Sequence, residues 1–143
     1  MALIVQKYGG SSVADTQSLQ RVARRIVQTR RAGHQVVVVV SAMGDTTDDL
    51  IDMAAQLNPK APAREMDILL SAGERISMSL LSMAISAQGV PAMAFTGAQA
   101  GIRTDAKYGK AQIVGMVPER IARVIRDNNV AIVAGFQGVN EAD

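Results

Sequence analysis

The sequence predicts a layered α/β domain built on a mostly parallel sheet. Three short segments are continuously apolar and rich in β-branched residues, as strands buried on both faces are: Leu3 to Gln6, Val36 to Val40 and Val130 to Ala134. Segments with apolar residues at helical spacing lie between them. Because strand and helix alternate along the chain, we expect parallel strands joined by right-handed crossovers and covered by helices.

The composition fits one globular domain. The chain has 143 residues, of which 48% are hydrophobic and 20% charged, and these values exclude a disordered, collagen-like or coiled-coil protein. A net charge of +2 and an aromatic content of 3% argue against a nucleic-acid partner. Cysteine is absent, which excludes disulfides and thiolate metal sites and makes the cytoplasm the simplest compartment. The apolar runs are strand-sized, so no membrane segment is expected.

The first helix is expected between the first two strands. Asp15 or Thr16 can cap its start, and Gly33 follows its end as a left-handed stop. The apolar residues at helical spacing are Leu19, Val22, Ala23, Ile26 and Val27. Arginines 21, 24 and 25 fall on the opposite side, where a solvated face is favoured over contact with RNA.

Two further helical regions follow the second strand. One is expected to start at Thr46 or Thr47 and to end before Asn58. The stretch from Glu65 to Gln88 has apolar residues at helical spacing, but Gly73 interrupts it. Glycine inside a helix costs about 1 kcal/mol relative to alanine, so we expect two helices here rather than one.

The last third of the chain contains shorter elements. Ala92 to Phe95 is expected to form a strand after the breakers Gly89 and Pro91. A hairpin is expected from Ile102 to Thr104 and Ala111 to Val114, with its turn at Tyr108 and Gly109. Pro118 is then suited to the first turn of a helix.

Small, polar, glycine-bearing segments follow three of the strands. They are Lys7 to Ser12, Ser41 to Thr47 and Gly135 to Gly138. The carboxyl ends of parallel strands meet at one edge of a sheet, where ligands bind. Glycines let backbone N–H groups approach an anion, and hydroxyls add donors. Such turns also use Gly and Ser for conformation alone, but three at one edge favour an anion or phosphate site.

Two charged residues have alternative interpretations. Lys7 can hold a positive charge over a transferring phosphoryl group, or it can simply extend from the sheet edge into solvent. The glycines that follow it favour the first interpretation. Glu74, expected at a helix start, can complement the helix dipole or accept a substrate ammonium group.

Several known motifs are absent from the sequence. There is no GxxxxGK followed by Ser or Thr, no GxGxxG after a strand and no HExxH. A P-loop nucleotidase, a dinucleotide-binding domain and a zinc hydrolase are therefore disfavoured. The single histidine, His34, is expected in an exposed turn.

Five motifs occur in order along the chain and carry a resemblance to a known family. They are KYGGSSV (7–13), VVVVVSAMGDTTDDL (36–50), LLSAGERIS (69–77), FTGAQAGI (95–102) and VAGFQGV (133–139). With them the chain closely resembles the amino-terminal part of the aspartate kinases, which belong to the amino-acid kinase superfamily. The resemblance covers essentially every residue.

The resemblance implies a three-layer α/β/α sandwich with an open, mostly parallel central sheet. It also implies ATP-dependent phosphorylation of L-aspartate to 4-phospho-L-aspartate, the first step towards lysine, threonine and methionine. Lys7 then matches the catalytic, phosphate-stabilising lysine, and Gly9, Gly10 and Ser11 match the loop along the phosphates of ATP. The residues that match the aspartate pocket are Ser41, Thr47, Glu74 and Phe136.

The resemblance also sets expectations about partners. Mg²⁺ would be held through the phosphates of ATP, and no protein ligand for a metal is expected. Residues 1–143 would form the amino-terminal part of a catalytic domain, truncated before the adenosine pocket and without regulatory ACT domains. A homo-oligomer, or a partner chain that completes the domain, is expected. The alternative is a non-catalytic phosphate-binding or assembly module that reuses the fold.

Overall fold

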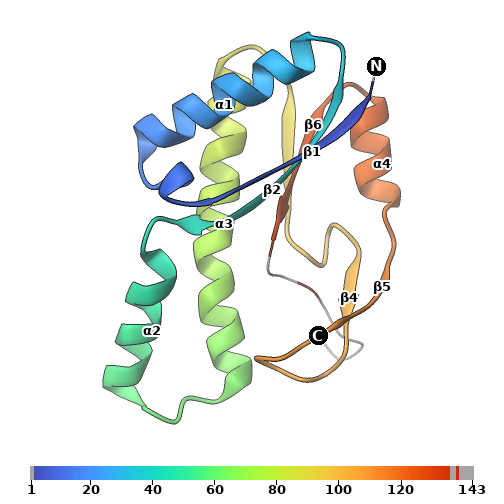
Figure 1. Ribbon diagram of the computed structural model, residues 1–143. Helices are drawn as coiled ribbons and strands as arrows, with labels where there is room; N and C mark the ends of the chain where they lie inside the picture. Colours follow the sequence, from blue (N-terminus) through green and yellow to red (C-terminus); the bar gives the residue numbers. More distant parts are fainter. Residues whose placement is uncertain (1, 136–137, 139–143) are drawn as a thin grey trace.

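The computed structural model describes residues 2–135 and 138 (Figure 1). Strands and helices alternate along most of this range, as the sequence predicts. The elements, in chain order, are β1 (Leu3–Gly10), a 3-10 turn (Ser11–Val13), α1 (Thr16–Arg31), β2 (Gln35–Met43), α2 (Thr46–Leu57), α3 (Ala63–Ala87), β3 (Ala92–Phe95), β4 (Ile102–Thr104), β5 (Ile113–Met116), α4 (Glu119–Arg126) and β6 (Val130–Ala134).

A parallel sheet forms the centre of the described residues. Its strand order is β1-β2-β6-β3, and each neighbouring pair runs parallel. The predicted parallel sheet is therefore confirmed. After β2 the chain passes through α2 and α3 to β3, at the far side of the sheet, and then through β4, β5 and α4 to β6. β6 lies between β2 and β3 and is buried along its length.

One face of the sheet packs against α1 and α3. On β2 the fully buried residues Val36, Val38 and Val40 alternate with partly exposed ones, so β2 presents one face to the core. Ile26 of α1 and Leu81 of α3 join them at 0% exposure in the main hydrophobic cluster. Burying each such side chain contributes about 1.5–3 kcal/mol, which makes this layer the main source of stability.

Side-chain hydrogen bonds also join β1 to α1. The Tyr8 hydroxyl donates to Gln6 Oε1 at 2.9 Å, and Gln6 Nε2 donates to Thr29 Oγ1 at 2.9 Å. Burial raises the pKa of the Tyr8 hydroxyl, so this group stays a protonated donor at neutral pH. At the start of α1, the Asp15 carboxylate caps the helix by accepting the Ser18 N–H at 2.7 Å.

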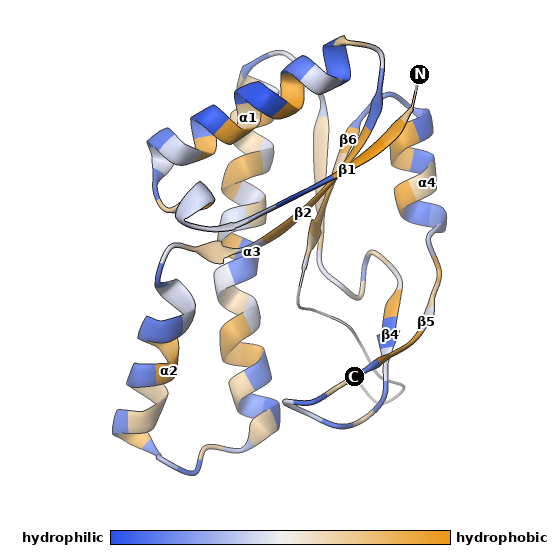
Figure 2. Ribbon diagram, viewed as in Figure 1, coloured by the Kyte–Doolittle hydropathy of each residue, from blue (hydrophilic) through white to orange (hydrophobic). Residues whose placement is uncertain are grey.

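The other face of the sheet is covered less completely. A smaller cluster joins Phe95, Val133 and Val124 of α4, with α4 packed on β2 and β6. On β1, Leu3 and Val5 are 56% and 63% exposed, and Figure 2 shows the hydrophobic first part of this strand next to the N-terminus. The expectation that every apolar strand is covered on both faces is therefore wrong for β1, because β1 is an edge strand lying beyond α4.

α3 is one continuous helix of 25 residues, and the prediction of two helices is wrong. Gly73 does not break it. A Cβ atom at position 73 would lie 3.0 Å from the Cβ of Ala42 and 3.3 Å from Cγ2 of Thr46. The helix tolerates glycine here because the missing side chain lets α3 approach β2 and α2 closely, and this packing outweighs a propensity cost of about 1 kcal/mol.

By length and composition α3 could cross a membrane, since one of its windows has a mean hydropathy of 1.4. A single helix of this kind is a weak indication, because core helices meet the same criterion. Residues 73–85 of α3 include six buried positions, and the helix packs on β2, β3 and α1. Packing over the sheet thus accounts for the buried face of α3, while Ile68, Ile76 and Met83 are exposed.

β1 and β2 extend further than their apolar runs. Lys7 and Gly10 pair with residues of β2, and Gly9 lies between them in β1, where the register shifts. Ser41 lies within β2, so these residues belong to the strands and do not follow them as the sequence predicts. Main-chain hydrogen bonds do not depend on apolar side chains, so the ladder continues into the polar segment. Smaller differences affect β5, which starts two residues later than expected, and α4, where Pro118 is the N-cap residue.

Two arginines at the end of α1 form hydrogen bonds at the opposite end of the sheet from these glycines, where β3 and β6 begin. Arg31 Nη2 donates to the Gln88 carbonyl at 2.8 Å, and Arg30 Nε donates to the Asn128 carbonyl at 3.3 Å. Gln88 and Asn128 belong to the turns that lead into β3 and β6. The end of α1 therefore holds both turns in place.

Candidate functional site

The carboxyl ends of β1, β2 and β6 meet at one edge of the sheet. The Gly44 N–H donates to the Gly10 carbonyl at 3.0 Å, and the Gly135 N–H donates to the Val40 carbonyl at 2.9 Å. The three glycine-bearing segments are thus neighbours in space, as the sequence predicts. This edge is also where α2 begins, and the partial positive charge of a helix N-terminus favours an anion.

Gly9 and Ser41 are in direct contact across β1 and β2. A Cβ atom built on Gly9 would overlap the Ser41 hydroxyl. The register between the two strands also shifts between Tyr8 and Gly10. Glycine at position 9 therefore makes room for the Ser41 side chain at the end of the sheet.

Gly10 turns the chain away from the sheet. Its φ of 53° and ψ of −119° are strained for a residue with a side chain, although no atom lies near the position of a Cβ. The exposed Ser11 follows in the 3-10 turn, and α1 begins at Thr16. Backbone groups of this turn are consequently presented at the edge of the sheet.

Lys7 lies on β1 opposite Val39 of β2. It is exposed, and strand alternation places it with Leu3 and Val5 on the face of the sheet away from α1. An exposed ammonium group three residues before the Gly10 turn can reach an anion at this edge. The same exposure suits a solvated lysine, so the role of Lys7 stays a prediction.

Glu74 lies within α3 and is only 4% exposed. The expectation that it starts a helix is wrong, because α3 begins at Ala63 and continues through Gly73. A role in complementing the helix dipole is therefore excluded, since that effect is limited to the first turn. A carboxylate buried this deeply is better suited to a polar or cationic neighbour.

Ser77 connects Glu74 to Ser41, and the sequence did not point to it. It is fully buried, and its Oγ lies 2.6 Å from the Ser41 carbonyl oxygen and 3.1 Å from the Glu74 carbonyl oxygen. The available signal was a serine on the apolar side of a helix, next to Met78 and four residues before Leu81. The main-chain carbonyl groups of Ser41 and Glu74 thus lie on either side of the Ser77 hydroxyl.

Two predicted pocket residues are less closely tied to this group. Thr47 is the second residue of α2 and is exposed at the start of that helix. Its neighbour Thr46 packs by its methyl group towards Gly73. Phe136 lies outside the described residues, so its predicted contact with substrate stays a prediction.

A cavity of about 560 Å³ opens beside this edge, between α3 and the β4–β5 hairpin. It shares Gly135 with the group of strand ends, whereas Lys7, Ser41, Thr47 and Glu74 do not line it. The sequence did not point to its charged lining, because these residues belong to separate elements. The charged and hydroxyl residues of the lining are Arg64, Asp67, Ser71, Arg75, Thr96, Thr104, Asp105, Tyr108 and Lys110.

The tip of the hairpin is fixed to α3. The Gly109 N–H donates to Asp67 Oδ2 at 2.9 Å, and Gly109 has a φ of 78°. Glycine adopts this conformation without strain, which lets its amide face α3. The hairpin therefore forms one wall of the cavity.

The chemistry open to this edge is the binding and positioning of anions. It combines close-packed glycines, hydroxyl groups, a helix N-terminus and an exposed lysine. Among residues 2–135 and 138, no group of three or more His, Cys, Asp or Glu side chains could hold a metal ion.

The sequence matches a known protein family. A model of the amino acid kinase family matches residues 2–143. The chain belongs to the amino acid kinase family. The resemblance stated from the five motifs is thereby confirmed, and so is the predicted fold, an α/β sandwich around a mostly parallel sheet.

Individual relatives agree with this family. The chain is 57% identical over 99% of its length to an aspartokinase of Mycolicibacterium smegmatis, and 50% identical over 96% of its length to one of Thermus thermophilus. It spans about a third of the length of these curated relatives, 34% in both cases.

Solved structures show the same fold. An aspartate kinase from Synechocystis matches 95% of the chain and 22% of its own length, with a TM-score of 0.81 at 44% identity. Aspartokinase III of E. coli, in complex with aspartate and ADP, matches 99% of the chain and 42% of its own length. Its TM-score is also 0.81, and at 20% identity this likeness concerns the fold alone.

Proposed function

We propose that this chain is part of the catalytic domain of an aspartate kinase, which transfers the γ-phosphoryl group of ATP to the side-chain carboxylate of L-aspartate. The observation that carries the proposal is the meeting of the β1, β2 and β6 ends at one edge, with Ser41 between Gly9 and Ser77. Relatives that are aspartokinases, 55–57% identical over 99% of the chain, support the choice of reaction.

The glycine turn and Lys7 are proposed to bind the phosphates. Phosphoryl transfer needs little covalent chemistry from the protein, so catalysis comes from alignment of the reactants and neutralisation of charge. Gly10 has the backbone conformation of a turn that can present N–H groups to phosphate oxygens. Lys7 would add a full positive charge close by, and Ser11 a hydroxyl donor.

Magnesium is proposed to enter with the nucleotide. The edge described above fits a metal–nucleotide complex in its anion-binding groups, while Mg²⁺ itself would be held by phosphate oxygens. The ion supplies further neutralisation of the charge on the transferred group.

The substrate amino acid is proposed to lie at the carboxyl end of β2, beside α3. Ser41 and Thr47 would donate hydroxyl hydrogen bonds to it, and Phe136, which follows β6 in the sequence, would contact it. Glu74 would accept hydrogen bonds from its ammonium group, because a carboxylate makes strong charge-assisted hydrogen bonds with a cation.

The test requires a catalytically complete enzyme. In a chimeric enzyme, residues 1–143 would replace the matching third of the Mycolicibacterium smegmatis aspartokinase. The product is an acyl phosphate, which hydroxylamine traps as a hydroxamate that gives a coloured complex with ferric ion. We expect hydroxamate only when ATP, Mg²⁺ and L-aspartate are all present, and none when L-glutamate replaces L-aspartate.

A control separates failure of folding from failure of the proposal. Circular dichroism and size-exclusion chromatography report whether the chimeric enzyme is folded. A folded chimeric enzyme that binds phosphate but forms no hydroxamate would overturn the kinase assignment and favour a phosphate-binding module.

A further inference from the structure

We infer that Ser77 is a positioning residue that fixes the distance between Ser41 and Glu74 in the aspartate pocket. This inference rests on the proposed function, because that proposal makes Ser41 and Glu74 contacts of one substrate. Ser77 itself touches no ligand, since it is fully buried. It acts through the two residues whose carbonyl groups it meets.

The hydrogen bonding of Ser77 differs from that of a helix serine nearby. A serine inside a helix usually donates to a carbonyl three or four residues earlier in the same helix. Ser79 does so, with its Oγ 2.7 Å from the Arg75 carbonyl oxygen. Ser77 has the Glu74 carbonyl within reach at 3.1 Å, but its shorter contact, 2.6 Å, is with the Ser41 carbonyl of β2.

The shorter contact joins two elements that carry different halves of the pocket. Ser41 is thirty-six positions before Ser77 in the chain, and it lies where the β1–β2 register shifts. The regular ladder is interrupted at this point, so the end of β2 gains a fixed position from α3. Glu74 lies one helical turn before Ser77 and is fixed by the same helix.

Close packing makes this link short. Gly73 lets α3 approach Ala42, with a Cβ at position 73 only 3.0 Å from the Ala42 Cβ. A residue with a side chain there would move the helix and lengthen the contact of Ser77 with β2. The short hydrogen bond of Ser77 to β2 therefore depends on the close approach of α3 that Gly73 permits.

A fixed spacing matters because one small substrate has to meet both groups. Binding groups on separate elements stabilise a ligand best when they are already in place, since no free energy is then spent on ordering them. Loss of the Ser77 hydroxyl would leave Ser41 and Glu74 present but free to shift relative to each other. Aspartate binding should then weaken, while ATP binding should not.

The test compares two serine-to-alanine variants of the chimeric enzyme. Ser77→Ala removes the bond to β2, and Ser79→Ala removes a helix-internal bond from the same helix and serves as the matched control. We expect Ser77→Ala to raise the KM for aspartate about fivefold, the effect of losing one neutral hydrogen bond, with the KM for ATP unchanged. Ser79→Ala should leave both values unchanged.

A conservative variant addresses the possibility of misfolding. Ser77→Cys keeps a small side chain with a weak S–H donor, so its KM for aspartate should lie between those of the wild type and Ser77→Ala. A merely structural role would lower the melting temperature and the amount of active enzyme, with the KM for aspartate unchanged. That result overturns the inference, and so does failure of both Ser77 variants to fold.

The wild-type chimeric enzyme separates this inference from the proposed function. Absence of aspartate phosphorylation by the folded wild type would contradict the kinase assignment itself. An active wild type with an unchanged KM for aspartate in Ser77→Ala would contradict only the role of Ser77.

Discussion

The hydroxyl of Ser41 fills the space that a side chain at position 9 would need. We therefore expect Gly9→Ala to destabilise the chimeric enzyme by about 1–3 kcal/mol, as overpacking does, and to impair aspartate phosphorylation. Thermal unfolding and the hydroxamate assay would measure the two effects. Gly115→Ala is the matched control, because a Cβ at position 115 has no atom within 4 Å. Equal melting temperatures for the two variants would contradict the close contact.

A substitution at Gly73 compares the effect of helix propensity with that of packing. Alanine at position 73 would gain about 1 kcal/mol in helix propensity, but its Cβ would press against buried Ala42. We expect packing to prevail, so that Gly73→Ala lowers the melting temperature. Ala42→Gly should restore part of it in the double variant, whereas additive effects of the two substitutions would argue against direct contact.

Lys7→Ala should slow turnover roughly a hundredfold without unfolding the protein. Removal of a group that stabilises charge in the transition state costs about 3 kcal/mol, or roughly a hundredfold in rate. The lysine is exposed, so its loss should leave the circular dichroism spectrum and the melting temperature unchanged. Lys60→Ala, in the loop between α2 and α3, is a control with equal loss of charge. Near-normal single-turnover phosphorylation by Lys7→Ala would remove the lysine from the mechanism.

The cap of α1 predicts a pH dependence. The Ser18 N–H donates to the Asp15 carboxylate and lowers the pKa of Asp15. A group whose pKa is lower in the folded state stabilises the protein above its ordinary pKa, and this stabilisation is lost as the pH falls through the folded pKa. Asp15→Asn keeps an acceptor without charge, so its melting temperature should be lower than wild type at pH 7. The difference should begin to shrink below about pH 4 and disappear only when the pH falls below the folded pKa of Asp15; a constant difference across this range would contradict the charge effect.

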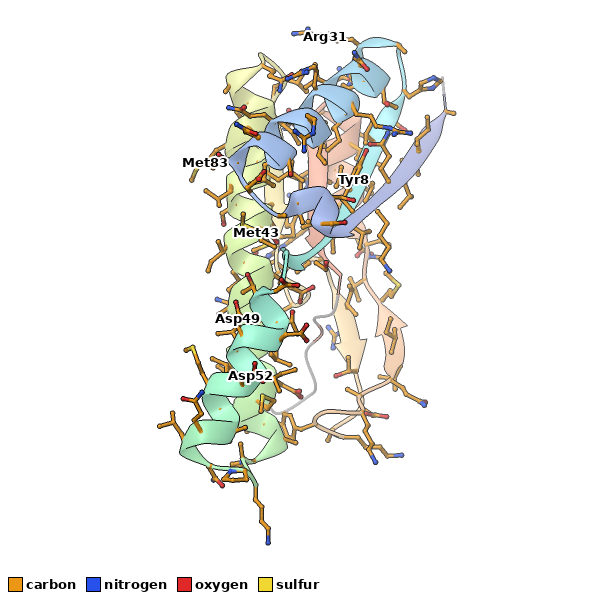
Figure 3. The ribbon with its side chains drawn as sticks, turned by 60° about the vertical axis from the view of Figure 1, so that its left-hand side comes forward. Tyr8, Arg31, Met43, Asp49, Asp52 and Met83 are labelled. Atoms are coloured by element: carbon orange, nitrogen blue, oxygen red, sulfur yellow. The ribbon has the colours of Figure 1, made fainter. Side chains whose placement is uncertain are left out.

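The Asp67 carboxylate should protect the hairpin tip from solvent. Because it accepts the Gly109 N–H at 2.9 Å, Asp67→Ala should increase hydrogen exchange at residues 107–110. Exchange in β2 should be unaffected. Asp52→Ala on α2 removes the same charge at a distance from the hairpin (Figure 3) and should leave this exchange unchanged. Equal exchange in all three proteins would show that the bond does not hold the tip.

Much of the fold is predictable because its signals are local. The β-branched runs specify β2 and β6, and Asp15 with Gly33 marks the ends of α1. The continuity of α3 was not predictable, because the reason for Gly73 is the Cβ of Ala42 on another element. Exposure of Leu3 and Val5 was missed for the same reason, since a strand sequence does not say whether the strand is at an edge.

The candidate site was also predictable only where its features follow from local sequence or topology. The meeting of three strand ends follows from parallel topology and could be predicted. Ser77 could not, because its importance comes from a contact with Ser41 that sequence spacing does not reveal. The cavity beside α3 was also missed, since Arg64, Thr96 and Lys110 come together only through the hairpin.

The arginine contacts at the end of α1 have a consequence for the whole domain. Figure 3 places Arg31 at one end of the molecule and Asp49 and Asp52 of α2 towards the other. Arg30 and Arg31 anchor the turns before β6 and β3 far from the glycine-rich edge. The contacts that fix these two turns and the groups proposed to bind ligands thus lie at opposite ends of the strands, so the loops of the proposed site can change while the strands keep their order.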